Sequence, residues 1–318
     1  MSGETPGTAP RPAGPAPSGA GSGWAVGAKL PHTGAAATGP AVRAAAVALE
    51  AAGFDSLWVS DHVVLPGRVA SAYPFASDGV ARWPTDVAYL EALVTLTTAA
   101  AVTERVRLGT AVLVLPQRQP VLLAKQAASL DALSGGRLVL GVGTGWLREE
   151  FAALGVPFDR RGRLATAAIE LLRDCWTGRP AGRPDGWAPG AHPLPDDLLV
   201  LPAPVRPVPL LVGGHSPAAL RRAGTLGDGW LAQQPAPGLD PALLAREVAE
   251  VRRHAEQAGR DPDALHVVLR VADSAGRCAD VAARVPELRA AGVAEVVVDT
   301  DPTGDPAADH ALLRAAGA

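Results

Sequence analysis

The sequence predicts one (β/α)8 TIM barrel, in which eight parallel strands close into a sheet and helices cover its outside. Short β-like runs alternate with helical runs from Trp24 to the end of the chain. The alternation repeats eight times over about 290 residues, which favours a barrel over a doubly wound sheet. A chain of 318 residues is long enough for two domains. Because no break interrupts the alternation, we expect a single barrel domain.

The strands of this barrel are predicted at short apolar runs. WAVGAKLP is the first of them, and AEVVVDT is the last. In chain order the predicted strands are residues 24–31, 54–60, 105–114, 136–143, 208–214, 228–234, 265–271 and 294–300.

Helices are predicted between these strands, where apolar residues recur with helical spacing. Gly53 ends the first helix as a left-handed C-cap would, and Thr85 suits the N-cap of the second. The predicted helices are residues 41–53, 85–102, 119–134, 160–176, 216–227, 239–259, 278–292 and 305–317.

Two segments lie outside this pattern. Residues 1–22 form a Pro/Gly/Ser/Ala tail that we expect to be disordered, so the barrel domain is residues 23–318. The tail has no apolar stretch that could serve as a signal-peptide core. Residues 178–207 are rich in proline and glycine and are predicted to be an insertion after the fourth strand.

The composition excludes several classes of protein. With 48% hydrophobic and 19% charged residues, the chain can bury a sizeable core, and a net charge of -3 gives no reason to expect a nucleic-acid partner. No apolar run reaches the roughly 20 residues needed to span a bilayer. Cys175 and Cys278 lie far apart and show no metal or disulfide spacing, which indicates a reducing cytoplasm.

The second predicted strand ends in the polar residues Ser60, Asp61 and His62, where a barrel of this class keeps its active site. A buried Asp–His pair can be structural, with each group satisfying the other's hydrogen bond. The position at the end of the strand favours function, because a histidine can act there as an acid, a base or a hydrogen-bond donor near neutral pH. We therefore expect His62 and Asp61 to be catalytic.

The fourth strand ends in the glycine-rich stretch GVGTGW, with glycines at positions 141, 143 and 145. Glycines allow a flat ring or a phosphate to approach the backbone closely. A dinucleotide fingerprint does not fit, because Trp146 stands where the third glycine is needed and no strand ending in an acid follows at the right distance. A tight turn beneath Trp146 is the structural alternative.

The fifth strand ends in Gly213 and Gly214, and a helix is predicted to begin near Pro217. Main-chain amides of Gly214, His215 and Ser216 at this helix start would form an anion site. N-capping by Ser216, with Pro217 in the first turn, fits the same residues. A third interpretation is a nucleophile elbow with Ser216 as the nucleophile, although the predicted barrel and Pro217 disfavour it.

The other histidines show no HxH or HxxxH spacing, so no metal site is expected. His32 follows the first strand and is a weaker candidate for the substrate pocket. Trp83 and Trp146 are predicted to shape that pocket, and Trp230 could line it. Tryptophans at such positions are also commonly part of the core.

Several of these stretches together resemble the bacterial-luciferase-like oxidoreductases, and in particular the branch that uses the deazaflavin coenzyme F-420. The resemblance is carried by AAGFDSLWVSDHVVLP, by the stretch from RVRLGTAVLVLP to GVPFDRRGR, and by PVPLLVGGHSPAALRRAGTLGDGWL. It is strong over residues 24–235 and extends to the rest by architecture. It implies a luciferase-like (β/α)8 barrel that binds FMN or F-420 at its C-terminal mouth and often forms a homodimer.

The resemblance also implies roles for matched positions. Asp61 and His62 would lie beside the deazaflavin ring, and Ala111 and Val112 would form a bulge with a cis peptide behind it. Thr144 and Gly145 would contact the edge of the ring. The phosphate-binding turn would consist of Gly213, Gly214, His215 and Ser216.

Two departures from the family pattern bear on the substrate. A sugar-phosphate dehydrogenase of this family has a glutamate proposed as proton donor where this chain has Trp146, which makes sugar-phosphate oxidation doubtful. Relatives commonly carry an acid after the RRGR stretch, where Thr166 and Ala167 stand here. We expect that second change to alter only a local hydrogen bond.

The predicted function is that of an F-420-dependent oxidoreductase, which exchanges a hydride with a small organic substrate held over the cofactor ring. In this prediction His62 donates a hydrogen bond or a proton, and Asp61 orients His62 or bonds the ring. An FMN-dependent monooxygenase of the same family is the first alternative, and a non-catalytic flavin-binding protein is the second. The substrate itself has no readable signature, although the loop at residues 63–85 and the insertion are expected to select it.

Overall fold

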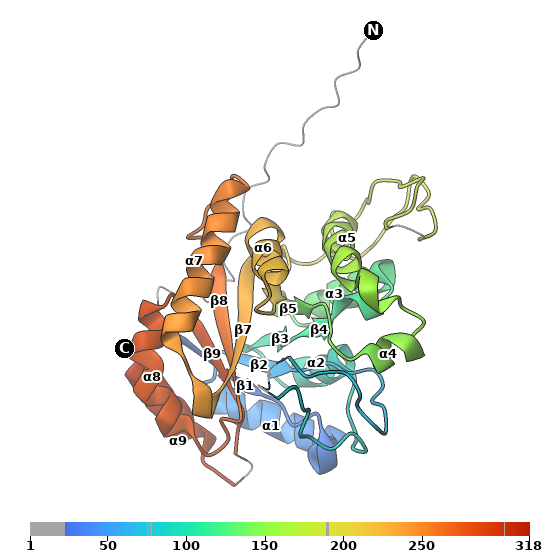
Figure 1. Cartoon of the computed structure of the whole chain (residues 1–318). Helices are drawn as coiled ribbons and strands as arrows, with labels where there is room; N and C mark the ends of the chain where they lie inside the picture. The colour runs from blue at the N-terminus through green and yellow to red at the C-terminus, as the bar shows by residue number, and fades with distance from the viewer. Residues whose placement is uncertain (1–22, 75, 77, 189–190, 302) are drawn as a thin grey trace.

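A computed structural model describes residues 23–74, 76, 78–188, 191–301 and 303–318. The predicted tail at residues 1–22 lies outside the described residues. Within the described part, the chain forms a closed parallel barrel with helices around it (Figure 1). The predicted fold class is confirmed.

Among the described residues, nine strands form the sheet, one more than predicted, because the third predicted strand is interrupted at Ala111 and Val112 and becomes β3 and β4. Pairing of β1 with β9 and of β3 with β5 closes the ring. The barrel therefore has eight strand positions around its ring, which we call staves. β3 and β4 share the third stave. The strands are β1 Ala25–Lys29, β2 Ser56–Val59, β3 Arg107–Thr110, β4 Leu113–Val114, β5 Leu138–Gly143, β6 Leu210–Gly213, β7 Gly229–Pro235, β8 His266–Ala272 and β9 Glu295–Val298.

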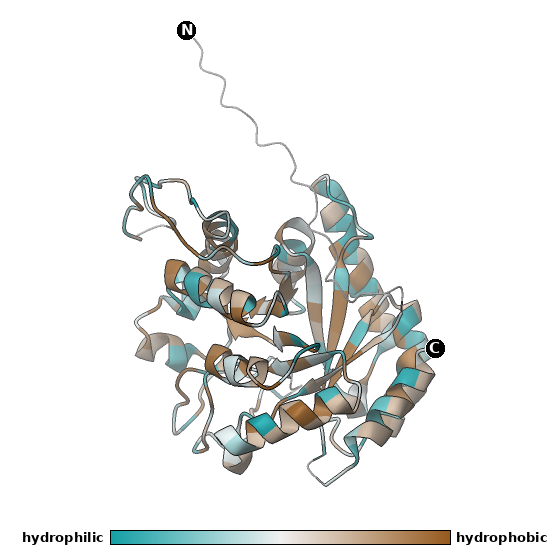
Figure 2. Cartoon of the chain, turned by 180° about the vertical axis from the view of Figure 1, so that it is seen from behind, coloured by the Kyte–Doolittle hydropathy of each residue, from teal (hydrophilic) through white to brown (hydrophobic). Residues whose placement is uncertain are grey.

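The helices pack on the outside of this ring and carry hydrophobic residues among hydrophilic ones (Figure 2), and many of the hydrophobic residues are buried in the core. Gly53 follows the first helix with φ of +98°, as expected for a glycine that ends a helix. The helices are α1 Gly39–Ala51, α2 Ala92–Ala100, α3 Pro120–Leu133, α4 Arg148–Ala153, α5 Arg161–Cys175, α6 Pro217–Leu226, α7 Pro241–Gln257, α8 Cys278–Ala290 and α9 Pro306–Ala316.

The expected start of the second helix at Thr85 is wrong. Helix α2 begins seven residues later, at Ala92, and the carboxylate of Glu91 caps it by accepting a hydrogen bond from the amide of Val94 at 2.8 Å. Residues 85–91 instead extend the loop that follows β2, where an isolated bridge joins Thr33 to Tyr89. This loop therefore reaches back across the end of β1.

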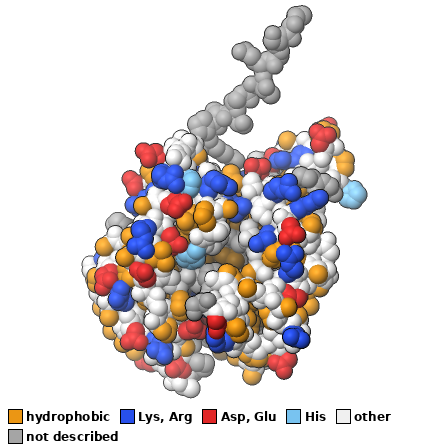
Figure 3. Space-filling view, in the orientation of Figure 1, with side chains coloured by type: hydrophobic (Ala, Val, Ile, Leu, Met, Phe, Trp, Pro, Cys, Tyr) orange, Lys and Arg blue, Asp and Glu red, His pale blue; other side chains and the backbone are white. Residues whose placement is uncertain are grey.

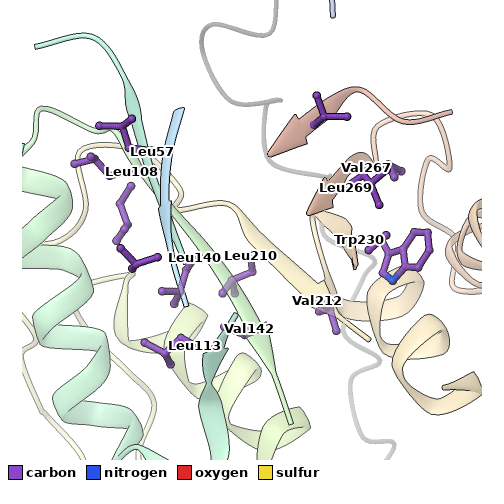
Figure 4. Close-up of a cluster of buried hydrophobic side chains, with 14 of the residues drawn as sticks. Leu57, Leu108, Leu113, Leu140, Val142, Leu210, Val212, Trp230, Val267 and Leu269 are labelled. Atoms are coloured by element: carbon purple, nitrogen blue, oxygen red, sulfur yellow. The ribbon is translucent and has the colours of Figure 1, made fainter. Parts of the chain in front are cut away.

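Successive residues of each strand face opposite sides of the barrel wall, as the pleat requires. The larger apolar cluster lies between the strands and the helices and includes Leu57, Leu140 and Trp230 (Figure 4). A smaller cluster fills the middle of the barrel, around Trp58, Leu231 and Val268. The barrel is therefore packed through its centre, and space for a ligand is left only at its ends.

The amino-terminal end of the barrel holds a buried charged group, the carboxylate of Glu295. It pairs with Arg107 at 2.7 Å, lies 3.3 Å from His266 and accepts a hydrogen bond from Ser56. Burial alone would raise the pKa of Glu295, but the charge of Arg107 and the hydrogen bonds from His266 and Ser56 outweigh burial and hold that pKa at about 2. This end of a barrel contributes to stability, because chemistry is kept at the other end.

Replacing Glu295 with glutamine should lower the free energy of unfolding at pH 7 by about 3 to 5 kcal/mol, because the buried Arg107 loses its ionised partner. The folded-state pKa lies below the ordinary value of 4.5, so the contribution of the carboxylate is complete above that pH and is lost as the pH falls toward 2. Urea unfolding of both proteins should therefore show a difference that shrinks over this interval.

The matched control is Glu287→Gln, which removes an exposed ion pair with Arg284 and should change the free energy of unfolding by less than about 0.5 kcal/mol. A loss at Glu295→Gln that is the same at neutral pH and at about pH 2 would contradict the role given to the ionised pair.

Candidate functional site

The candidate site is the carboxyl end of the barrel, where segments that follow four neighbouring staves meet. These are Ser60 to His62 after β2, the bulge between β3 and β4, the turn after β5, and the turn between β6 and α6. The space-filling view shows a hollow near the centre of one face, with Lys and Arg side chains gathered around it (Figure 3). In Figure 1 that region lies over the strands of the barrel.

Asp61 is buried, and its carboxylate is directed toward the third stave. One oxygen accepts a hydrogen bond from Arg118 at 2.6 Å, and the other accepts one from the amide of Val114 at 2.9 Å. Burial raises the pKa of Asp61, and the Arg118 guanidinium and the Val114 amide oppose that rise. Asp61 therefore anchors the bulge, and this arrangement replaces the expected contact between Asp61 and His62.

His62 is instead paired with Glu150, a residue that the sequence did not single out. Its Nδ1 lies 3.1 Å from one carboxylate oxygen, and the other oxygen accepts hydrogen bonds from the amides of Val63 and Val64 at 2.6 and 3.2 Å. Only 1% of the Glu150 side chain is exposed. Burial would raise the pKa of Glu150, but its hydrogen bonds, above all the one with His62, outweigh burial and lower it.

Glu150 was missed because it is the second of two adjacent glutamates at the start of α4, in a sequence typical of a solvated first turn. Nothing local distinguishes it from Glu149. Glu149 binds the amides of Ala70 and Ser71. Together the two carboxylates fasten the loop after β2 to α4 at two points.

His32 occupies a closed position rather than an open pocket. Its side chain has no exposed surface, its Nδ1 lies 2.8 Å from the carbonyl of Leu30, and its Nε2 lies 3.0 Å from the amide of Ser60. Burial, followed by the charge of Lys29, lowers the pKa of His32 to about 4, so the ring is neutral at pH 7. His32 therefore supports Ser60, whose hydroxyl is bonded to Tyr89.

The structure brings Trp83 and Trp146 together with Tyr73 in an edge-to-face cluster. Ring centroids are 4.6 Å apart for Tyr73 and Trp83, 5.1 Å for Tyr73 and Trp146, and 5.9 Å for the two tryptophans. His62 lies 6.2 Å from Trp146 and 5.4 Å from Tyr89. This cluster forms an aromatic wall beside His62.

Trp230 does not line this site. It is completely buried, and its Nε1 donates a hydrogen bond to the carbonyl of Gly214 at 2.9 Å. The possibility that Trp230 lines the pocket is therefore wrong, because the pleat of β7 directs this side chain toward the helices.

The bulge between β3 and β4 contains a cis peptide between Ala111 and Val112, as the family resemblance implied. Val112 fits against the backbone of the next two staves. A Cβ added to Gly143 would lie 2.5 Å from one Val112 methyl, and one added to Gly213 would lie 2.6 Å from the other. Glycine is therefore required at both strand ends, because the Val112 side chain packs over their Cα atoms.

The turn after β5 places Thr144 and Gly145 directly beside this bulge. Gly145 has φ of +76°, and a Cβ there would also meet Val114 and Phe151 at 2.6 and 2.7 Å. A side chain at this position is excluded on both grounds. Glycine at position 145 therefore lets this turn pack tightly against the buried side chains of Val114 and Phe151.

The turn between β6 and α6 leads directly into the capped start of that helix. Gly214 has φ of +112°, and the hydroxyl of Ser216 caps the helix by accepting from the amide of Ala219 at 3.3 Å. The imidazole of His215 is held by Glu247 at 2.9 Å and by the amide of Gln233 at 3.1 Å. The Ser216 hydroxyl therefore serves as an N-cap, and the histidine beside it is engaged elsewhere, which disfavours a nucleophile elbow.

The described residues contain no group of three or more His, Cys, Asp or Glu side chains that could hold a metal ion. None of the helices in that part of the chain is long and apolar enough to cross a membrane.

Comparison with known families gives a match over most of the chain. The family described as luciferase-like monooxygenase matches residues 22–305. An uncharacterized protein of Mycobacterium tuberculosis is 40% identical over 224 residues, which are 70% of this chain and 74% of the relative. An F-420-dependent glucose-6-phosphate dehydrogenase of Nakamurella multipartita is 33% identical over 229 residues, 70% of this chain and 60% of that protein.

Solved structures share the fold at lower identity. An F-420-dependent secondary alcohol dehydrogenase in complex with an F-420–acetone adduct superimposes with a TM-score of 0.71 and 17% identity, over 92% of this chain and 98% of that one. The FMN-bound oxygenating constituent of 3,6-diketocamphane monooxygenase from Pseudomonas putida gives a TM-score of 0.56 and 18% identity, over 78% and 66%. These likenesses show a shared luciferase-like barrel.

The pairing of Asp61 with Arg118 gives a test by double-mutant cycle. Arg118→Met should lower the free energy of unfolding by about 3 to 5 kcal/mol, because it leaves the buried Asp61 carboxylate without a cation, and Asp61→Asn should lower it by less, because Arg118 keeps Glu91 at 3.4 Å. The double variant should lose less than the sum, since the second change removes the group that the first one stranded. Urea unfolding measures all three.

Asp159→Asn provides the control, because it breaks an exposed pair with Arg148 and should change the free energy of unfolding by less than about 0.5 kcal/mol. Strictly additive losses at Asp61 and Arg118 would show that the two residues do not act as a pair.

Proposed function

Because the chain belongs to the luciferase-like monooxygenase family, we propose that it is an oxidoreductase that binds coenzyme F-420 at the carboxyl end of the barrel. The reaction proposed is hydride exchange with a small organic substrate beside the cofactor ring. The choice of cofactor is supported by the F-420-dependent dehydrogenases of Nakamurella multipartita and Beutenbergia cavernae, which are 33% and 38% identical to this chain. The observation that carries a catalytic role is the pair formed by His62 and Glu150.

The residues at the mouth fit a flat ring with a phosphate-bearing side chain. The bulge at Ala111 and Val112, with the Val112 side chain packed over Gly143 and Gly213, and the turn at Thr144 and Gly145 would hold the ring. The turn at residues 213–216 would hold a phosphate at the start of α6. When bound, the deazaflavin supplies the carbon that takes up or releases a hydride.

His62 would act on the substrate through Nε2. Its Nδ1 is engaged by Glu150, and the carboxylate favours a proton at that nitrogen. Nε2 is then the ring nitrogen that can donate to, or accept from, a substrate oxygen. Glu150 is a positioning residue in this proposal, because it holds the imidazole and the adjoining backbone of Val63 and Val64 together.

The aromatic wall at Tyr73, Trp83 and Trp146 would keep water away from the substrate. Trp146 has no proton to give as a general acid, so glucose 6-phosphate is not the substrate we propose. Gln233, which donates to the hydroxyl of Tyr73 at 3.3 Å, would link this wall to the sixth stave. His32 would act indirectly, by holding Ser60.

An FMN-dependent monooxygenase is the second candidate, and the family description and the FMN-bound structural relative favour it. The same bulge and turn would accept a flavin ring. A non-catalytic flavin-binding role is a third candidate, which the pairing of His62 with Glu150 disfavours and which turnover of any substrate would exclude. The homodimer stays a prediction from the family resemblance, as does a cytoplasmic location, with which the two free, buried cysteines agree.

The cofactor is tested by titrating the protein with F-420 and with FMN, each oxidised and reduced, and following fluorescence or absorbance. We expect F-420 to bind in the micromolar range or more tightly and FMN to bind at least about tenfold more weakly. Gly145→Ala should abolish binding of the preferred cofactor, because the added methyl group would meet Val114 and Phe151. Tight binding of FMN without binding of F-420 would contradict the proposed cofactor and favour the FMN-dependent monooxygenase.

The role of His62 is tested in an activity assay. The substrate is the first compound, from a panel of small alcohols and ketones, that is found to oxidise or reduce F-420. His62→Ala should lower kcat by about 10²-fold or more, as expected for loss of a general acid or base. Its dissociation constant for F-420 should change by less than about threefold, which is under 1 kcal/mol.

Glu150→Gln separates positioning from chemistry in the same assay. It should lower kcat less than His62→Ala does and should change the pH profile of kcat, because the charge that favours the proton on Nδ1 is lost. Asp159→Asn, an exposed carboxylate change, should leave both kcat and the profile unaltered. An unchanged kcat in His62→Ala would refute the role proposed for the imidazole.

A further inference from the structure

Lys29 stands at the carboxyl end of β1 and faces the inside of the barrel. Gly27, two residues earlier, faces inward, since a Cβ there would lie 2.4 Å from the hydroxyl of Ser56 and 2.8 Å from the indole nitrogen of Trp58. Residues two apart in a strand share a face. Lys29 is therefore the last inward residue of β1, in register with Trp58 of β2, which closes the middle of the barrel.

The neighbouring staves place a second cation in this layer. Arg270, the inward residue near the end of β8, donates to the carbonyl of Val271 and, at 2.6 Å, to the carboxylate of Asp299, which follows β9. The charge of Arg270 is thus balanced by Asp299. Asp273, the other nearby carboxylate, is exposed to water in the turn after β8, where its charge is well screened.

Lys29 itself has no ion-pair or hydrogen-bond partner among the described residues. Burial and the charge of Arg270 lower the pKa of its ammonium group to about 8, despite the opposing effect of Asp299. A partly buried cation without a partner is unfavourable unless an anion joins it. Only two residues of the chain are lysines, so the composition does not explain a lysine at this position.

The topology separates Lys29 from the turn that we propose for the cofactor phosphate. β1 and β6 are the first and fifth of eight staves, so Lys29 and the turn at residues 213–216 lie on opposite sides of the mouth. The bulge and the turn proposed for the ring belong to the third and fourth staves. A ligand group at Lys29 would therefore belong to the substrate rather than to the phosphate of the cofactor.

We propose that Lys29 binds an anionic group of the substrate, a carboxylate, sulfonate or phosphate, at the mouth of the barrel. The aromatic wall at Tyr73, Trp83 and Trp146 would receive the apolar part, so the substrate class is a small aromatic or apolar acid. Arg270 and Asp299 hold the rest of the layer in place, and His32 stays neutral beside the cation. The proposal rests on the proposed function in one respect, namely that the mouth also receives the substrate.

Competitive labelling of the wild-type protein tests the site directly. Acetic anhydride modifies the two lysines, and mass spectrometry of the peptides reports each one separately, so the exposed Lys125 is an internal control. Benzoate, naphthoate and inorganic phosphate are compared with the neutral benzamide. We expect at least one of the anions to protect Lys29 by about threefold or more, benzamide to protect it less, and Lys125 to remain unaffected.

Binding of anilinonaphthalene sulfonate, an aromatic sulfonate whose fluorescence rises in apolar surroundings, tests the same site with variants. Lys29→Met keeps the length of the side chain and removes its charge, and it should weaken binding by about tenfold or more. Lys29→Arg should retain most of the affinity because it keeps the charge. Lys125→Met, the matched change at the surface, should bind as the wild type does.

Both experiments are carried out without F-420 or FMN, so their result is independent of which cofactor binds. Protection of Lys29, together with no binding of F-420 in the titration, would support the anion site and contradict F-420 as the cofactor. Equal labelling of Lys29 with all four compounds, or equal sulfonate binding by Lys29→Met and the wild type, would overturn the anion site. If Lys29→Met does not fold, labelling of the wild-type protein and sulfonate binding by the Lys29→Arg variant decide whether the anion site exists.

Discussion

The closed register of the parallel sheet is the constraint on which the rest of this structure depends. Once β1 pairs with β9 and β3 with β5, every second residue of each strand must face either the barrel interior or the helices. Apolar side chains fill both faces through the middle of the barrel, with Trp58 inside and Trp230 outside. Polar inward residues are thereby confined to the two ends, where one set can support the fold and the other can serve chemistry.

Ionised groups at those ends are each satisfied by specific partners, and the partners define what each group does. Glu295 pairs with Arg107 in a layer closed to solvent, so its contribution is to stability. Asp61 is bound by Arg118 and by an amide of β4, so it holds the bulge. Glu150 binds an imidazole at the mouth, where a ligand can reach the other ring nitrogen. Lys29 is the contrasting case, a cation of the upper layer that forms no ion pair or hydrogen bond with the described residues, although Asp299 lies near it.

The proposed division of the mouth follows from the same geometry. On the third to fifth staves, Val112 packs over the glycines at the ends of β5 and β6, and we propose that the cofactor lies against this surface. The first, seventh and eighth staves offer charge, at Lys29, Arg270 and Asp299. The long loop after β2 adds aromatic rings between the two regions. A flat cofactor and an acidic substrate would therefore meet beside His62, each held by a different part of the ring.

The sequence by itself determined the eight-fold alternation, the order of the staves and the position of Ser60 to His62 at a strand end, because period and chain order are local properties. The family resemblance added the cis peptide at Ala111 and Val112. Only the tertiary structure decided the partners. Glu150 lies 88 residues from His62, and Arg118 lies 57 from Asp61, so no local pattern could join them. The same holds for Lys29, whose environment is made by strands at the far end of the chain, and for Trp230, which the pleat of β7 turned into the core.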